Sequence, residues 1–287
     1  MEVAKVRTGE DQPSPKALRQ AIRDVIASCI YGVDKNPLAV DLCKVALWLE
    51  AHNPGEPLNF LDHHIKCGDA IVGLARKEEL ENGIADEAFK KMPDDDKNIR
   101  ARLAKQNKQE RAMAEQREVF YRHSEFSRIE KSFTDISRMF TSFNALPETS
   151  IDQIADKRSE YQVMISGENW RLLKSLCDIQ TAQFFIPKSP ENEGAIITDG
   201  AFRQYMNGIG VFRGGLADMA AAEMCCEKRF FHWFLEFPEV FSEGGFDCIL
   251  GNPPFLGGQK LTGAFGQRFL EYVKCIYAPA GTGTLGG

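Results

Sequence analysis

In the first fifty residues, two stretches with apolar residues at helical spacing flank one short continuous apolar run. Residues 14–28 place apolar side chains every three or four positions, behind a Ser that can cap a helix and a Pro that suits its first turn. The run Cys29–Val33 favours a short buried strand that ends at Asp34. Asn36-Pro37 then opens a second helix. The apolar positions of that helix recur at helical spacing and are Leu38, Leu42, Val45 and Leu49. Strand, acidic residue and helix in this order predict one unit of a doubly wound α/β sheet.

Two later stretches predict further strands of the same sheet. Residues 61–71 end in Gly68-Asp69-Ala70. The apolar run from Cys248 to Leu250 is closed by a Gly and a Pro pair, and Pro cannot donate to a sheet ladder, so the backbone must leave the sheet there. We expect Asp34, Asp69 and Asn252 at one sheet edge, because open α/β sheets bind ligands at the carboxyl ends of their strands.

The composition shifts between about residues 76 and 229. Residues 94–131 are dense in charges of both signs, which is typical of a long solvated helix. More apolar helices are predicted at 168–186 and 216–229, and a short amphipathic one at 266–276. An aromatic run over 230–241 most simply packs in the core and returns the chain to the sheet, although stacking on exposed bases is an alternative.

Composition limits the classes of protein to consider. Of the 287 residues, 43% are hydrophobic and 26% are charged, which supports a packed core and argues against global disorder. No apolar run is long enough for a transmembrane helix, and the polar N-terminus lacks the apolar centre of a signal peptide. The eight cysteines include no C-x-x-C pair, which favours a reduced, cytoplasmic protein.

The charge balance argues against a broad basic surface. The net charge is −6, so contacts to nucleic acid must be local or lie on other sequence. Basic residues of the predicted long helix are candidates for such contacts, but a solvated charged face is the simpler interpretation. These residues are Arg100, Arg102, Lys105 and Lys108.

The tetrapeptide Asn252-Pro253-Pro254-Phe255 suggests chemistry on an exocyclic amine of a flat ring. Methylation of such an amine needs acceptors for its hydrogens, and the carboxamide oxygen of Asn and a carbonyl fixed by Pro are two such acceptors. An aromatic residue three positions later can hold the base by stacking, once the base has been extruded from the duplex. An ordinary Asn-Pro turn would have the same sequence, so the surrounding context must decide.

In that context the tetrapeptide resembles the catalytic motif of adenine-N6 DNA methyltransferases of the large restriction–modification and phage-defence type. The resemblance implies that Asn252, Pro253, Pro254 and Phe255 are catalytic. It also implies double-stranded DNA as the partner and adenine as the target. The aromatic run before the tetrapeptide strengthens the resemblance, because a similar run occupies this place in the family.

The same resemblance implies S-adenosyl-L-methionine as cofactor. Asp34 would bind its ribose, and Asp69, followed by Ala70, would accept from the amino group of its adenine. Lys35 stands where the family often has an apolar residue, and its stem would cover the adenine only in part. A helix cap is the alternative role of Asp34.

The implied fold class is α/β, a partial Rossmann-like methyltransferase core with a large helical insertion. Residues 1–75 and 229–287 would form the core and residues 76–228 the insertion. The family holds the methionine part of the cofactor with a glycine-rich turn ahead of the first acid, but only two scattered glycines precede Asp34. We therefore expect an internal fragment of a larger enzyme, with little affinity for the cofactor of its own and with its flanking parts as possible partners.

Other motifs in the sequence have simpler interpretations, and two other functions are consistent with it. His63, His64 and Cys67 suggest a metal, but no further ligand follows at metal spacing, so packed or solvated histidines are favoured. Residues 281–286 match G-x-G-x-x-G without the strand and helix that such a loop needs. Two other functions stay open: a catalytically incomplete remnant or split subunit that acts only through a partner, and methylation of protein glutamine, whose family uses a similar motif, usually with Tyr.

Overall fold

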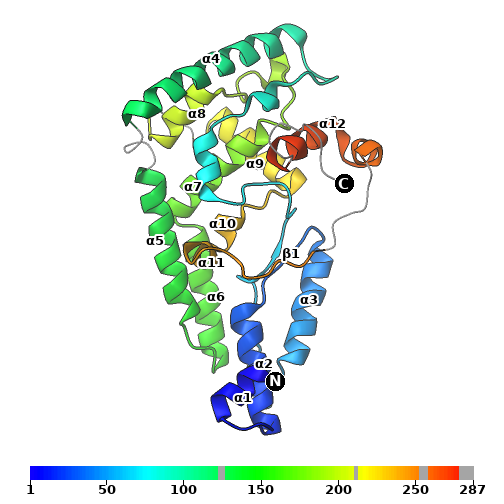
Figure 1. The fold of residues 1–287 in the computed structure, drawn as a ribbon, viewed down its shortest axis with the longest axis vertical. Helices are drawn as coiled ribbons and strands as arrows, with labels where there is room; N and C mark the ends of the chain where they lie inside the picture. The colour runs from blue at the N-terminus through cyan, green and yellow to red at the C-terminus, as the bar shows by residue number, and fades with distance from the viewer. Residues whose placement is uncertain (122–126, 210–212, 252–257, 278–287) are drawn as a thin grey trace. The chain divides into compact units, whose positions relative to one another are not determined.

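The computed structural model describes residues 1–121, 127–209, 213–251 and 258–277 (Figure 1). They form two compact units, which are described separately. Unit 1 comprises Met1–Ala70 and Ser137–Gly167, and unit 2 comprises Ile71–Ile136 and Glu168–Gly287. The described residues are mostly helical, with one parallel two-stranded sheet. No described helix is both long enough and apolar enough to cross a membrane.

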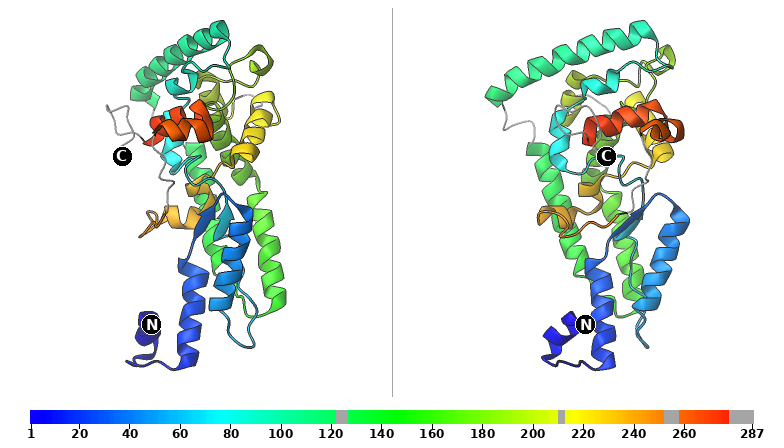
Figure 2. Two further views of the ribbon diagram at one scale, coloured as in Figure 1. Left: turned by 90° about the vertical axis from the view of Figure 1, so that its right-hand side faces the viewer. Right: turned by 45° about the vertical axis from the view of Figure 1, so that its right-hand side comes forward.

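Helices α2 and α3 of unit 1 are capped at their first turns as the sequence predicts. The Oγ of Ser14 accepts from the backbone N of Ala17 at 3.2 Å, and the Oδ1 of Asn36 accepts from the N of Leu38 at 3.0 Å. In both helices Pro occupies the first turn, where its missing N–H costs nothing. The elements of this unit are α1 (Glu2–Thr8), α2 (Pro15–Cys29), β1 (Gly32–Asp34), α3 (Pro37–Glu50), β2 (Ile65–Cys67), the second half of α5 (Ser127–Asn144) and α6 (Ile151–Ile165). Both views of Figure 2 show α1 against the N-terminal part of α2.

The sheet of unit 1 consists of β1 and β2, which pair in parallel with α3 between them in sequence. The register sets Gly32 opposite Ile65 and Asp34 opposite Cys67. The first strand begins later than the sequence predicts, because α2 continues to Cys29. This strand–helix–strand unit agrees with the expected α/β arrangement, and the wider Rossmann-like core stays a prediction.

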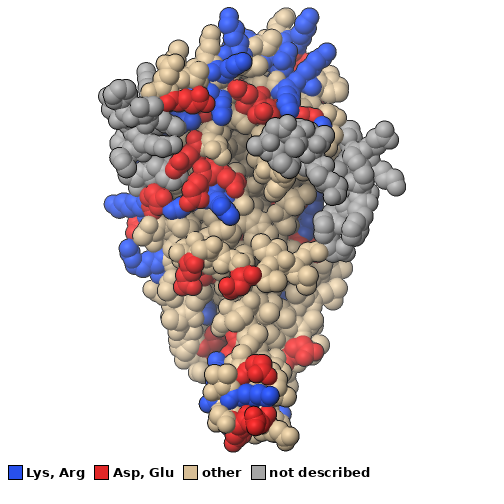
Figure 3. All heavy atoms as spheres, viewed as in Figure 1, with Lys and Arg blue, Asp and Glu red and all other residues tan. Residues whose placement is uncertain are grey.

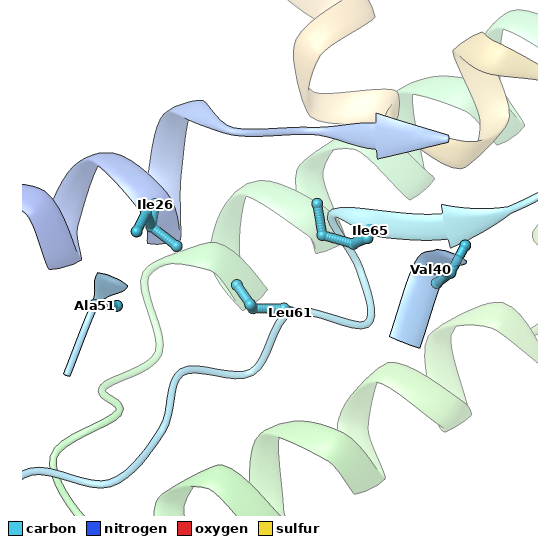
Figure 4. Close-up of a cluster of buried hydrophobic side chains, with 5 residues drawn as sticks. All are labelled: Ile26, Val40, Ala51, Leu61 and Ile65. Atoms are coloured by element: carbon cyan, nitrogen blue, oxygen red, sulfur yellow. The ribbon is translucent and has the colours of Figure 1, made fainter. Parts of the chain in front are cut away.

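The core beneath this sheet comes from α2, α3 and the segment that leads into β2. Five apolar side chains are buried together, as Figure 4 shows: Ile26, Val40, Ala51, Leu61 and Ile65. Leu47 and Trp48 of α3 pack at the margin of this cluster. Burial of these side chains is what holds the two short strands in place, because strands this short are marginal without a packed face.

The periodic apolar stripe of α3 does not face this core. Leu42 is 61% exposed and Leu49 is 73% exposed, and Leu38 and Val45 are exposed as well. Helical spacing correctly predicts the helix but not its buried side, because Val40 and Leu47 form a second apolar row on the opposite side.

Unit 2 is helical in its described part and is built around α7 (Glu168–Ala182), which is almost fully buried from Leu172 onward. Helix α9 (Leu216–Lys228) packs along α7. The other elements are η1 (Lys77–Asn82), η2 (Asp86–Phe89), α4 (Lys97–Tyr121), the first half of α5, η3 (Pro190–Asn192), α8 (Asp199–Met206), α10 (Trp233–Glu236), α11 (Pro238–Ser242) and α12 (Gly258–Tyr277).

The helices expected from the sequence are present in unit 2, with modest changes in their bounds. The predicted helix 94–131 corresponds to α4 and the start of α5, and residues 168–186 end as a helix four residues early, at Ala182. Helix α12 contains a non-helical residue, Gly266 (φ 83°), so that its second part matches the predicted helix 266–276. The division of the chain into core and insertion is not tested by these bounds and stays a prediction.

The predicted strand at residues 248–250 is wrong. These residues have no strand pairing, and Ile249 and Leu250 are 75% and 96% exposed. An apolar run becomes a strand only where a neighbouring strand satisfies its backbone N–H and C=O groups, and the described sheet has only β1 and β2. The expected three-strand edge is therefore reduced to the two strands of unit 1.

Candidate functional site

The carboxyl ends of β1 and β2 bring together three of the predicted cofactor residues. Asp34 is the last residue of β1 and lies opposite Cys67, the last residue of β2. Lys35 and Asp69 follow these strand ends, and the Nζ of Lys35 lies 2.8 Å from the Oδ2 of Asp69. Ala70 comes next and is half-buried. Two carboxylates and one ammonium group thus share one edge of the sheet of unit 1.

The two carboxylates of this edge differ in their surroundings. Asp34 is exposed, and its Oδ1 accepts from the backbone N of Asn36 at 2.6 Å. Asp69 is only 8% exposed, and Lys35 neutralises it. The local hydrogen bond of Asp34 and the ion pair of Asp69 with Lys35 hold the two carboxylates at this edge. The side chain that caps α3 is that of Asn36, and Asp34 accepts from the backbone N of this capping residue and not from the first amides of the helix. The ligand-binding role of Asp34 stays a prediction.

The amine of Lys35 donates to the Oδ2 of Asp69 at 2.8 Å. The expectation that its stem covers part of an adenine ring stays a prediction. A buried carboxylate is costly unless it is paired, so this contact stabilises the loop after β2 in the absence of a ligand.

His63 and His64, which precede β2, are packed as aromatic rings in the core of unit 1. They are 2% and 1% exposed. His63 stacks on Phe60 with 5.4 Å between the ring centroids, and His64 lies 3.9 Å from Tyr31 by the same measure. Burial, together with the charges of the nearby Lys66 and Lys157, lowers the pKa of His63 far below its usual value and that of His64 to about 3. Within the described residues, no three His, Cys, Asp or Glu side chains form a group that could hold a metal ion.

The segment that follows Ala70 in the chain is held by the aromatic run of unit 2. We call residues 71–74 the strap. The backbone N of Phe231 donates to the O of Val72 at 2.8 Å, and the N of Trp233 donates to the O of Leu74 at 2.9 Å. The N of Leu74 in turn donates to the Nδ1 of His232 at 3.1 Å. The strap and residues 231–233 are therefore joined by three hydrogen bonds.

The middle of the strap is fixed by α12. The hydroxyl of Tyr272 donates to the O of Gly73 and accepts from its N, both at 2.8 Å, and Tyr272 is 1% exposed. Gly73 has φ 145°, and a Cβ there would lie 2.1 Å from the O of Phe231. Only glycine therefore allows the strap and the aromatic run to approach this closely. The hydroxyl of Tyr277 also donates to the O of Ile71, at 3.1 Å.

The side chain of His232 is bonded to a buried carboxylate, which is in turn paired with a lysine. The Nε2 of His232 lies 2.9 Å from the Oδ1 of Asp178, and the Nζ of Lys174 lies 2.6 Å from the Oδ2 of the same carboxylate. Because Nδ1 accepts from Leu74, the ring proton is on Nε2 and is donated to Asp178. Burial alone would raise the pKa of Asp178, but His232 and Lys174 hold it below its usual value. The carboxylate therefore fixes both the tautomer and the orientation of the imidazole.

The predicted catalytic residues Asn252, Pro253, Pro254 and Phe255 lie outside the described residues. The sequence did not indicate the roles of Gly73, His232 and Tyr272. His232 and Tyr272 bond to the strap across 158 and 199 positions of the chain, and Gly73 allows the backbone of Phe231 to approach the strap closely. A single glycine inside an apolar stretch was the one local signal that could have pointed to such an approach at Gly73.

Comparison with known proteins adds one finding. The family model described as Eco57I restriction-modification methylase matches residues 28–170 and 172–279. The match covers most of the chain, includes all the predicted cofactor and catalytic positions, and runs through the helical block between them. No curated protein and no solved structure matches the chain.

Proposed function

Because the chain belongs to the Eco57I restriction-modification methylase family, we propose that it forms part of a DNA methyltransferase specific for the exocyclic amine of adenine. The proposed cofactor is S-adenosyl-L-methionine, and the proposed partner is duplex DNA. The observation that carries the proposal is the pairing of β1 with β2, which brings Asp34, Lys35 and Asp69 to one sheet edge.

The chemistry of this edge fits the proposed cofactor. The ribose hydroxyls and the adenine amino group are hydrogen-bond donors, and Asp34 and Asp69 are carboxylate acceptors. Asp34 would hold the ribose, in line with the usual role of an acid at the tip of such a strand. Asp69 would accept a hydrogen bond from the adenine amino group. Its carboxylate would then be shared between this amino group and the ammonium group of Lys35. When bound, the cofactor supplies the methyl group.

The catalytic role is assigned to Asn252-Pro253-Pro254-Phe255 on sequence grounds. The carboxamide oxygen of Asn252 would accept a hydrogen bond from the target amine, and this contact would turn the nitrogen lone pair toward the methyl donor. Phe255 would stack on the extruded base. In support, the strap directly follows Asp69 and Ala70 in the chain and is bound within unit 2 by residues on both sides of this tetrapeptide in sequence.

We further propose that the glycine-rich turn of the family is supplied by sequence other than these 287 residues. The stretch before Asp34 has only Gly9, which ends α1, and Gly32, which is the first residue of β1, so neither lies in a turn between a strand and a helix. The chain would then work as part of a longer enzyme.

The proposed function can be tested by product analysis. The protein encoded by the whole reading frame that contains residues 1–287 is incubated with unmethylated DNA and with S-adenosylmethionine that carries a deuterated methyl group. Mass spectrometry of the nucleosides is expected to find deuterated N6-methyladenine. Label on cytosine would contradict the adenine assignment, and label on a protein glutamine would contradict DNA as the substrate.

A further inference from the structure

Over residues 97–116, helix α4 packs against the rest of unit 2 with one of its sides. Leu103 and Asn107 on that side are buried. The Nδ2 of Asn107 donates to the O of Ile84 at 3.0 Å and to the Oδ1 of Asp86 at 2.7 Å, and its Oδ1 accepts from the N of Asp199 at 2.9 Å. A buried amide with three partners sets the rotation of the helix about its axis, so the opposite side is held toward solvent.

This helix has a charge opposite to that of the chain as a whole. Residues 97–116 contain six basic and two acidic side chains and carry +4, whereas the chain carries −6. The basic residues are Lys97, Arg100, Arg102, Lys105, Lys108 and Arg111, and the acidic ones are Glu110 and Glu115. Figure 3 shows blue Lys and Arg side chains gathered over the region where Figure 1 labels α4.

Contacts within unit 2 divide these charges into two groups. Arg102 forms an ion pair with Glu193, and the Nη1 of Arg111 donates to the O of Asn82 at 2.7 Å. The Oε2 of Glu110 accepts from the N of Gly200 at 2.7 Å, so this acid is turned toward the protein. Lys97, Lys105 and Lys108 are all exposed. The only other acid of residues 97–116, Glu115, lies about two turns beyond Lys108.

The three exposed lysines lie along one side of α4. At 3.6 residues per turn, they fall within about 80° of each other around the axis and span about 16 Å along it. Lys105 and Lys108 are three residues apart, which places their Cβ atoms about 5–6 Å from each other. A rigid row of ammonium groups on long stems suits a row of phosphates, because each amine can reach a separate oxygen.

We propose that this lysine face, formed by Lys97, Lys105 and Lys108, binds the phosphate backbone of duplex DNA. The proposal rests on the proposed function, which makes DNA the polyanion that this chain must meet. Residues 97–116 include no aromatic side chain on which an unpaired base could stack. Contacts to a duplex backbone need none. The face would add affinity without reading sequence.

The test compares two variants of the full chain in which the same number of positive charges is removed. The first carries Lys97→Gln, Lys105→Gln and Lys108→Gln. The control carries Lys16→Gln, Arg19→Gln and Lys131→Gln, which are exposed positions of α2 and α5. Fluorescence anisotropy of a labelled duplex of mixed sequence is measured from low to moderate salt, and circular dichroism verifies that both variants are folded.

We expect the parent chain to bind the duplex with a steep dependence on salt. In the first variant the slope of log affinity against log salt should fall by up to about 2.7, which is about 0.9 for each phosphate that a lysine no longer neutralises, and binding should be at least roughly tenfold weaker. The control should keep the parent slope. The proposal is overturned if the parent does not bind at low salt, if both variants are weakened equally, or if single-stranded RNA competes better than duplex DNA.

The binding experiment and the methylation experiment can succeed or fail independently of each other. Loss of DNA binding with the first variant alone supports the lysine face even if no methylated adenine is found. Conversely, methylation of adenine with unchanged binding by the first variant keeps the proposed function and removes the lysine face.

Discussion

At the scale of single residues, the strap depends on one phenol. Both backbone polar groups of Gly73 are bonded to the hydroxyl of Tyr272, which is buried with its ring against Phe184 and Phe185. A buried N–H or C=O without its partner keeps the full cost of its removal from water. The phenol is therefore a more sensitive position than its apolar surroundings suggest.

Replacement of Tyr272 by Phe tests this dependence. The change keeps the ring and removes both hydrogen bonds, so the free energy of unfolding should fall by about 1–3 kcal/mol in urea titrations. Hydrogen exchange at the amide of Gly73 should accelerate. The control is Tyr277→Phe. Tyr277 is 45% exposed, and water can replace its hydrogen bond to the O of Ile71, so the effect of this change should stay within about 0.5 kcal/mol. Equal effects of the two changes would contradict this role of Tyr272.

The buried histidines of unit 1 predict a pH dependence of its stability. Their pKa values are lowered in the folded state, that of His64 to about 3, whereas an unfolded chain binds a proton at each ring below about 6.5. Between these values the unfolded state binds more protons, so stability is complete above pH 6.5 and is lost as the pH falls. The expected loss is about 1.4 kcal/mol per pH unit for each histidine.

Urea titrations between pH 7 and 5 measure this slope above the range in which most carboxylates titrate. His64→Gln should lower the slope by about one proton, whatever it does to the stability at pH 7. His52→Gln, at an exposed position, should leave the slope unchanged. An unchanged slope in His64→Gln would show that this ring is protonated in the folded protein.

At the scale of elements, α3 presents apolar side chains on both of its sides. Val40 packs in the core of unit 1, and Leu42, two residues away, is 61% exposed. The spacing of apolar residues would be equally consistent with either side being buried. Packing against the two strands decides between them.

Truncation on the two sides of α3 should therefore have unequal effects. Val40→Ala removes buried methyl groups and should lower the free energy of unfolding by about 1–3 kcal/mol. Leu42→Ala should change it by no more than about 0.5 kcal/mol, because its side chain is largely in water already. Thermal and urea unfolding of both variants provide the measurement, and a larger loss of stability in Leu42→Ala would mean that its side of the helix is covered.

At the scale of the whole molecule, the proposed function assigns cofactor binding and catalysis to different parts of the chain. Asp34 and Asp69 belong to unit 1, and Asn252 falls within the residue range of unit 2. The proposed division of roles predicts that binding of the cofactor and turnover respond to different substitutions.

Asn252→Ala in the enzyme of the whole reading frame should affect turnover alone. The acceptor for the target amine is removed, so the rate should fall by roughly two to three orders of magnitude, as when one preorganised polar group is removed from an active site. Cofactor affinity, measured by calorimetry, should remain near that of the parent. A parent-like rate of adenine methylation would remove Asn252 from the mechanism.

Phe255→Ala provides the contrasting change. Removal of a stacking surface should weaken capture of the extruded base by about 1–3 kcal/mol, and Phe255→Tyr should recover much of this. Rates and apparent affinities for DNA would be measured on the same substrate as for Asn252→Ala. An Ala variant that keeps the parent affinity, or a Tyr variant that recovers none of the affinity, would contradict stacking by Phe255.

The sequence alone was sufficient for features that depend on neighbours along the chain. Ser14 and Asn36 cap their helices as expected, because a cap bonds to amides two or three residues away. Helical periodicity located α2, α3, α7 and α9 to within a few residues. The order of strand, acid and helix also indicated the parallel β1–β2 pair and hence the shared edge of Asp34 and Asp69.

Only the tertiary structure decided features that depend on partners far along the chain. The apolar residues 248–250 are exposed and not a strand, because the described sheet offers them no partner. The ion pair of Lys35 with Asp69 and the bonds of Tyr272 and His232 to the strap join residues separated by 34 to 199 positions. No local pattern encodes such pairings. They arise when burial brings polar groups out of water and leaves each group only the partners that the fold provides.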